Sequence, residues 1–88
     1  MSYKVEYTSK AKKDLKKLPV DIAKNIILSI NSTKGDPYSF VKKIKGTKRH
    51  SLYTHRVGEY RVILDIEDDR LLIMVIEAGH RRKIYRKY

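Results

Sequence analysis

Residues 51–66 read SLYTHRVGEYRVILDI and divide into two strand-like runs, 51–57 and 60–66, on either side of the pair Gly58-Glu59. Both runs contain the β-branched and aromatic residues that are typical of strands. Glycine at the first central position favours a two-residue type II′ turn between antiparallel strands. The stretch therefore predicts a β-hairpin in which Val57 lies opposite Tyr60 and Arg56 lies opposite Arg61.

The predicted hairpin has two unlike faces, because side chains alternate along each strand. One face would carry the pairs Val57/Tyr60, His55/Val62, Tyr53/Leu64 and Ser51/Ile66. That face is mostly apolar, so we expect it to rest on helices, with His55 as a partly buried structural residue. The other, otherwise exposed face would carry the pairs Arg56/Arg61, Thr54/Ile63 and Leu52/Asp65.

Upstream of the hairpin, the sequence predicts one strand and two helices. Residues 3–7 alternate apolar and polar side chains, which indicates a short half-buried strand. Thr8 and Ser9 are both suitable N-caps for the next helix, and Pro19 ends that helix and suits the start of a second. The apolar faces are Ala11, Leu15 and Leu18 in the first helix, and Ile22, Ile26 and Ile30, flanked by Ala23 and Ile27, in the second, which runs to about residue 32.

The remaining segments complete an α+β domain. Residues 42–50 predict an irregular basic stretch, residues 67–70 a turn, residues 71–78 a third strand-like run and residues 80–88 a basic tail. The predicted order is β-α-α-β-β-β, with a two-helix hairpin packed on one face of a mainly antiparallel four-stranded sheet. With 88 residues, the chain is expected to form a single domain, residues 1–88.

Positive charge dominates the composition. Twenty-one Lys and Arg against 10 Asp and Glu give a net charge of +11, which favours a polyanionic or acidic partner. Arg56 and Arg61 repel each other across the hairpin, and a bound anion would relieve that repulsion. Arg81 and Arg82 follow the third strand-like run, and the basic stretch before the hairpin can border the same face. We therefore expect a concave basic patch that grips phosphate through guanidinium groups, with Tyr85 close by.

Composition also restricts the chemistry. The chain has no cysteine, which excludes disulfides, thiolate metal sites and cysteine nucleophiles. The three histidines lack ligand spacing, so we expect neither a metal nor another cofactor. No apolar run approaches the roughly 20 residues that span a bilayer, and no apolar segment of a signal peptide is evident. We expect a cytoplasmic protein with no membrane partner.

Two motifs, in order, resemble a known family. Residues 52–63, LYTHRVGEYRVI, are similar to the R-V-G-[DE]-Y-R-V hairpin of RelE-type toxins. Residues 78–85, AGHRRKIY, resemble the G-H-R-x-x-[IV]-Y ending of the same family. Ile44-Lys45-Gly46 matches a short L-[KR]-G element ahead of the hairpin, and the opening strand and first helix also fit. The resemblance covers nearly the whole chain.

The resemblance implies the toxin of a toxin–antitoxin pair, which cuts messenger RNA in the ribosomal A site without a metal. In that family the 2′-hydroxyl attacks the neighbouring phosphate, leaving a 2′,3′-cyclic phosphate and a 5′-hydroxyl. Arg61 and Arg81 match arginines that hold and charge-stabilise the scissile phosphate. Tyr85 matches a tyrosine that stacks on the substrate or takes the 2′-hydroxyl proton, and Lys45 and Arg56 match basic positions along the RNA groove. The implied partner is an acidic RelB-like antitoxin, in a hetero-oligomer.

One departure from the family pattern affects the chemistry. Leu52 and Thr54 lie on the Arg56/Arg61 face at positions that are often basic in close relatives. The identities of the general base and of the leaving-group acid are therefore open. Lys48, Arg49 or His50 in the preceding loop can substitute for the missing base or acid. Lys48 and Arg49, with Arg82 after the third strand, are also expected to bind substrate.

Alternatives to this interpretation stay open. A ParE-like gyrase inhibitor would share the fold but lack the combined set of Arg61, Arg81 and Tyr85. A non-catalytic RNA- or ribosome-binding protein would carry the same charge. Glu77 can act as an acid or base, although a single carboxylate near many cations is more often a structural ion pair.

Overall fold

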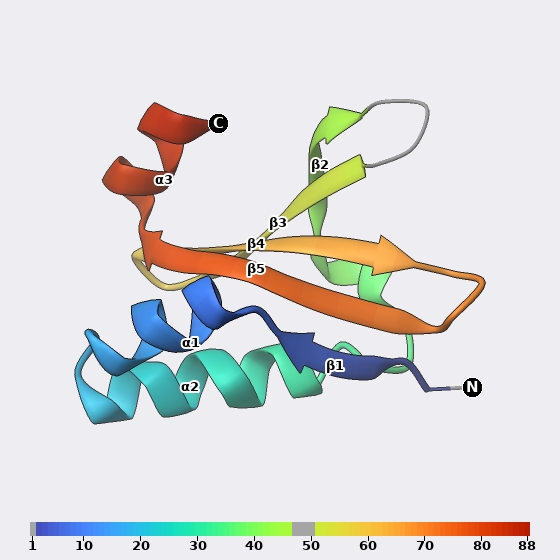
Figure 1. Cartoon of the computed structure of the whole chain (residues 1–88), viewed down its shortest axis with the longest axis horizontal. Helices are drawn as coiled ribbons and strands as arrows, with labels where there is room; N and C mark the ends of the chain where they lie inside the picture. Colours follow the sequence, from blue (N-terminus) through green and yellow to red (C-terminus); the bar gives the residue numbers. More distant parts are fainter. Residues whose placement is uncertain (1, 47–50) are drawn as a thin grey trace.

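The computed structural model describes residues 2–46 and 51–88, which form a five-stranded sheet with helices on both sides (Figure 1). The elements are β1 (Lys4–Tyr7), α1 (Ser9–Lys16), α2 (Val20–Asn31), the 3-10 helix η1 (Pro37–Phe40), β2 (Lys42–Gly46), β3 (Ser51–Val57), β4 (Tyr60–Glu67), β5 (Leu72–His80) and α3 (Arg81–Lys87). The strand order is β1-β5-β4-β3-β2; β1 runs parallel to β5, and the other neighbours are antiparallel. The predicted α+β class and mainly antiparallel sheet are confirmed.

The β3–β4 hairpin has the predicted register. Val57 pairs with Tyr60, and Arg56 pairs with Arg61. Gly58 has a φ of +59°, whereas Glu59 does not adopt a positive φ. This combination fits a type II′ turn and excludes a type I′ turn, which needs a positive φ at both central residues. A Cβ on Gly58 would meet nothing within 4 Å, so glycine is required here by the backbone angle alone.

The apolar core lies between the sheet and the helix pair α1–α2. Its buried members are Ala11, Leu15, Ile26, Ile30, Val62, Leu64, Ile73, Val75 and Ala78. Tyr53, Val57 and Tyr60 pack against this core, so the predicted helix-facing side of the hairpin is confirmed. Thr8, rather than Ser9, caps α1, because its hydroxyl oxygen accepts a hydrogen bond of 3.1 Å from the Ala11 N–H.

The prediction of four strands was wrong by one, because residues 42–46 form the edge strand β2. Its backbone pairs Lys42 with Thr54 and Lys43 with Tyr53, and a bulge shifts the register before Lys45 pairs with Leu52. An edge strand needs a partner on one side only, and lysines on it discourage pairing with other chains. The lysine-rich sequence that indicated an irregular stretch is therefore compatible with a strand.

The basic tail also has regular structure, which its sequence pattern did not predict. Residues Arg81–Lys87 form α3, which lies on the opposite side of the sheet from α1 and α2 (Figure 1). The His80 Nδ1 accepts a hydrogen bond of 3.3 Å from the Arg82 N–H at its start. Ile84 is its buried residue. One buried side chain gives no repeating pattern, so periodicity could not reveal this helix.

The sheet face of Arg56 and Arg61 is therefore less open than expected. Thr54 and Ile63, a cross-strand pair on that face, are both buried. The helix α3 packs against β4 and β5 on this side. None of the helices in residues 2–46 and 51–88 is long and apolar enough to cross a membrane.

Candidate active site

Arg61 and Tyr85 are in contact on the face of the sheet that carries α3. Arg61 lies opposite Gly79 in the β4–β5 ladder. A Cβ at position 79 would lie 3.6 Å from Ile84 Cδ1, so Ile84 packs directly on this backbone. The next residue, Tyr85, accepts a hydrogen bond of 2.5 Å from Arg61 Nη2, and its ring centroid lies 5.1 Å from Arg61 Cζ. The guanidinium group is thus held against the phenol.

The Arg61–Tyr85 pair combines a positive charge with an accessible aromatic ring. Arg61 Nε is buried and has no hydrogen-bond partner among the described residues. Leaving a buried donor unpaired costs about 1–3 kcal/mol, and because this atom is not exposed, an anion would respond to the charge of the guanidinium group rather than to Nε itself. Tyr85 is 58% exposed, which leaves its ring accessible to a stacking partner. The pair is suited to a ligand that combines an anion with a flat base.

Arg56 adds a second guanidinium group to this face. It pairs directly with Arg61 across the β3–β4 ladder and is exposed. Its Nε donates a hydrogen bond of 3.1 Å to the carbonyl oxygen of Gly58, which turns the side chain toward the hairpin turn. Two cations that oppose each other in one ladder favour an anion between them.

Arg81 joins the start of α3 to the hairpin turn. Its backbone N–H donates a hydrogen bond of 2.9 Å to the carbonyl oxygen of Glu59, and its Nε lies 3.1 Å from Glu59 Oε2. The Arg81 and Glu59 side chains are 43% and 59% exposed, and exposed pairs of this kind typically contribute about 0.2–1 kcal/mol. A phosphate can therefore replace the Glu59 carboxylate at little cost.

The other predicted substrate-binding residues are less well defined. Arg82 is exposed in the first turn of α3. Lys45 lies in β2, paired through its backbone with Leu52 of β3. Lys48 and Arg49, like His50, lie outside the described residues.

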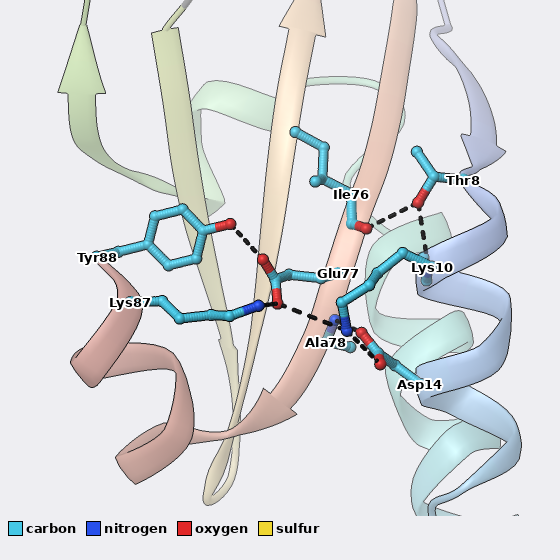
Figure 2. Close-up of polar contacts among 9 residues, drawn as sticks. Thr8, Lys10, Asp14, Ile76, Glu77, Ala78, Lys87 and Tyr88 are labelled. Carbon is cyan, nitrogen blue, oxygen red and sulfur yellow. Dashed lines mark hydrogen bonds and ion pairs between the residues drawn. The ribbon is translucent and has the colours of Figure 1, made fainter.

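Glu77 lies on the same sheet face as Arg61, two positions before Gly79 in β5, and is 5% exposed. Its carboxylate accepts hydrogen bonds from the Tyr88 hydroxyl and from Lys87 Nζ, the latter at 3.0 Å, and Lys10 Nζ lies 3.9 Å away (Figure 2). Burial alone raises the pKa of Glu77. The hydrogen bonds from Tyr88 and Lys87, together with the nearby ammonium charges, outweigh burial, so the net effect lowers the pKa of Glu77. These contacts favour the structural role for Glu77 over that of a catalytic acid.

Polar contacts that were not predicted from the sequence fix α1 to the edge of β5. The Asp14 carboxylate accepts hydrogen bonds of 3.2 Å from the Ala78 N–H and 2.8 Å from Lys10 Nζ (Figure 2). Thr8 donates a hydrogen bond of 2.7 Å to the carbonyl oxygen of Ile76. Asp14 falls at helical spacing with Ala11 on the buried face of α1, a signal that was present in the sequence.

A cleft lies on the opposite side of the sheet from the Arg61–Tyr85 pair. It has a volume of about 270 Å³ and is lined by described residues of α2 and the hairpin turn, namely Ile22, Asn25, Val57, Gly58, Glu59 and Tyr60. Within the described residues, no group of three or more His, Asp or Glu side chains could hold a metal ion.

Comparison with known proteins gives near full-length matches. Residues 5–85 match the family described as ParE toxin of type II toxin–antitoxin system, parDE. Toxin RelE3 of Methanocaldococcus jannaschii is 35% identical over 91 residues, which cover 93% of this chain and 94% of that protein. Toxin RelG of Mycobacterium tuberculosis is 27% identical over 88 residues, which cover 99% and 100% of the two chains.

A solved structure shows the same fold. The crystal structure of the archaeal RelE–RelB complex from Pyrococcus horikoshii OT3 matches this chain with a TM-score of 0.77 and 27% identity. The match covers 92% of this chain and 97% of that one.

Proposed function

Because this chain belongs to the RelE/ParE superfamily of type II toxins, we propose that it is a RelE-like endoribonuclease that cuts messenger RNA in the ribosomal A site, in the cytoplasm. The observation that carries the proposal is the contact between Arg61 and Tyr85. Arg56 lies opposite Arg61 in the ladder, and Arg81 begins the helix that carries Tyr85. The described residues thus supply two guanidinium groups, Arg56 and Arg61, and an exposed aromatic ring on one face, while the Arg81 side chain is paired with Glu59 at the hairpin turn.

The proposed reaction is an internal transesterification. The 2′-oxygen of a ribose forms a bond to the adjacent phosphorus, and the bond from phosphorus to the 5′-oxygen of the next nucleotide breaks. The 2′-hydroxyl loses a proton, the departing 5′-oxygen gains one, and the products are a 2′,3′-cyclic phosphate and a 5′-hydroxyl. No metal is needed for this balance.

In this reaction the arginines act on the phosphate and Tyr85 acts beside it. Negative charge accumulates on the phosphate oxygens in the transition state, and Arg61 and Arg81 are assigned to stabilise it. Arg56, Arg82 and Lys45 are assigned to bind the flanking backbone. The exposed ring of Tyr85 stacks on the neighbouring base or exchanges the 2′-hydroxyl proton, because its oxygen is held by Arg61.

The proposal includes an acidic antitoxin as protein partner. The structure from Pyrococcus horikoshii is a complex of RelE with RelB. A net charge of +11 favours a partner of opposite sign. Such a partner would neutralise the basic face and block access to RNA.

The test is primer extension on translated messenger RNA after brief expression of the chain. We expect cuts confined to A-site codons, and a loss of about 10²–10³ in cleavage rate for Arg61→Ala and Arg81→Ala. Lys24→Ala, an exposed change on α2, serves as the control and should cut normally. Circular dichroism of each variant checks that it is folded.

The second candidate is a ParE-like action on gyrase, because the matching family carries the ParE description. DNA breaks with intact messenger RNA would support this candidate and refute ribonuclease activity. Growth arrest with neither broken DNA nor cut RNA would indicate a non-catalytic binding protein.

A further inference from the structure

The helix α3 is too short to be stable by itself. It contains seven residues, whereas isolated helices shorter than roughly 12–15 residues are marginal in water. Its start is fixed by the backbone bond from Arg81 to Glu59, and its middle by Ile84, which is 2% exposed on the sheet. Its last turn, which follows Tyr85, needs a separate anchor.

Glu77 supplies that anchor. One carboxylate oxygen, Oε1, accepts the hydrogen bond from the Tyr88 hydroxyl, and the other, Oε2, accepts the one from Lys87 Nζ. Tyr88 also donates its backbone N–H to the carbonyl oxygen of Ile84, at 3.1 Å, so this contact is continuous with the helix. Hydrogen bonds to an ionised, buried carboxylate are stronger than those between neutral groups.

The position of Glu77 in the ladder relates this anchor to Tyr85. Glu77 pairs with Ile63, and Gly79, two residues on, pairs with Arg61. The chain therefore leaves the sheet after His80, turns through α3, and returns at Tyr88 to Glu77 (Figure 2). Tyr85 lies within this closed loop, at the point where its hydroxyl meets Arg61.

We propose that Glu77 is a positioning residue that acts through Tyr88 and Lys87 to hold the last turn of α3 on the sheet, and so keeps the Tyr85 hydroxyl on Arg61. The consequence for catalysis rests on the proposed ribonuclease function. The anchoring of α3 by Glu77 is independent of that function.

The anchor extends to α1 through a second cation, Lys10. Lys10 Nζ lies 2.8 Å from Asp14 Oδ1 and 3.9 Å from Glu77 Oε2 (Figure 2). Asp14 in turn holds the Ala78 N–H of β5. The Glu77 carboxylate, which holds α3, is therefore also in contact with α1, the helix that Asp14 fixes to the edge of β5.

The test uses Tyr88→Phe and Glu77→Gln, with Tyr38→Phe as a matched control. Tyr88 is 41% exposed, so its hydroxyl can be removed without opening the core. Tyr38 is also 41% exposed and donates a hydrogen bond of 2.6 Å to the Asp68 carboxylate, away from α3. The control thus removes the same kind of hydrogen bond elsewhere.

Two readouts are needed. Hydrogen exchange of the α3 amides in the free protein measures how firmly the helix is held, and the Tyr85 ring resonances report its contact with Arg61. Ribosome-dependent cleavage then separates kcat from KM. For Tyr88→Phe and Glu77→Gln we expect α3 exchange to rise about tenfold or more, and kcat to fall by a similar factor with KM little changed.

Unchanged α3 exchange and Tyr85 resonances in Tyr88→Phe would overturn the proposal, as would equal effects in Tyr38→Phe. Faster α3 exchange with a normal kcat in these variants would show that the anchor holds α3 but does not position a reacting group. That result would also overturn the proposal. A wild-type chain that cuts no RNA would defeat the proposed function, while exchange and Tyr85 resonances would still decide whether Glu77 anchors the helix.

Discussion

At position 55, the imidazole Nδ1 lies 2.9 Å from the carbonyl oxygen of Phe40, and Nε2 lies 2.7 Å from Ser29 Oγ. A carbonyl can only accept, so Nδ1 carries a proton, and in the neutral ring Nε2 accepts the hydrogen bond of the Ser29 hydroxyl. His55 is 6% exposed. Both nitrogens are therefore occupied in joining β3 to α2 and to the last residue of η1.

This geometry predicts a structural defect rather than a catalytic one for His55→Ala. The substitution leaves a small cavity and removes the hydrogen bonds to Ser29 and to the Phe40 carbonyl, so the free energy of unfolding should fall by about 1–3 kcal/mol. For a domain of this size each kcal/mol lowers Tm by about 4–8 °C, which a thermal melt measures. Below the melting transition the cleavage rate should be near normal. A normal Tm with lost cleavage would instead indicate that His55 takes part in the reaction.

The contrast between His55 and Tyr88 shows what the sequence could reveal about single residues. The burial of His55 and the pairing of Arg56 with Arg61 followed from strand periodicity and one turn, both of which are local. The Tyr88–Glu77 bond depends on how a short helix closes back on the sheet, which no local pattern encodes. The proximity of Tyr85 to the arginines was expected, but its hydrogen bond to Arg61 was not.

At the scale of elements, α3 and β2 were missed for different physical reasons. β2 is a lysine-rich edge strand whose stability comes from the free edge of β3 rather than from its own composition. α3 depends on the burial of Ile84 against the sheet and on Glu77 for its last turn. The elements with regular apolar patterns, α1, α2 and the β3–β4 hairpin, were all predicted.

The anchor of α3 should weaken at high pH. Burial, and then the hydrogen bond to Glu77, raise the pKa of Tyr88 from 10.0 to about 12. A group whose pKa is higher in the folded state stabilises the fold through its protonated form. That contribution is complete below pH 10.0 and is lost as the pH rises through about 12. The difference in unfolding free energy between the wild type and Tyr88→Phe, measured by urea denaturation, should therefore shrink across this window. A constant difference would show that the Tyr88 hydroxyl does not contribute through this bond.

At the scale of the whole molecule, the charge of +11 acts at two ranges. The net field attracts any polyanion, and lysines far from the candidate site contribute to it as much as arginines within it. A phosphate bound between Arg56 and Arg61 would also release counterions locally, which only contacting residues can do. Salt dependence separates these two effects.

Affinity for a short single-stranded RNA should therefore fall steeply with salt, with a log–log slope of about −0.7 for each phosphate engaged. Arg56→Gln should make the slope shallower by about 0.7, because it removes one phosphate contact. Lys24→Gln removes the same charge from an exposed position on α2, which covers the other side of the sheet, so its slope should match the wild type. Fluorescence anisotropy over a salt series measures all three slopes. If the two variants change the slope equally, the RNA responds to the overall field and not to the Arg56–Arg61 face, and the site assignment fails with it.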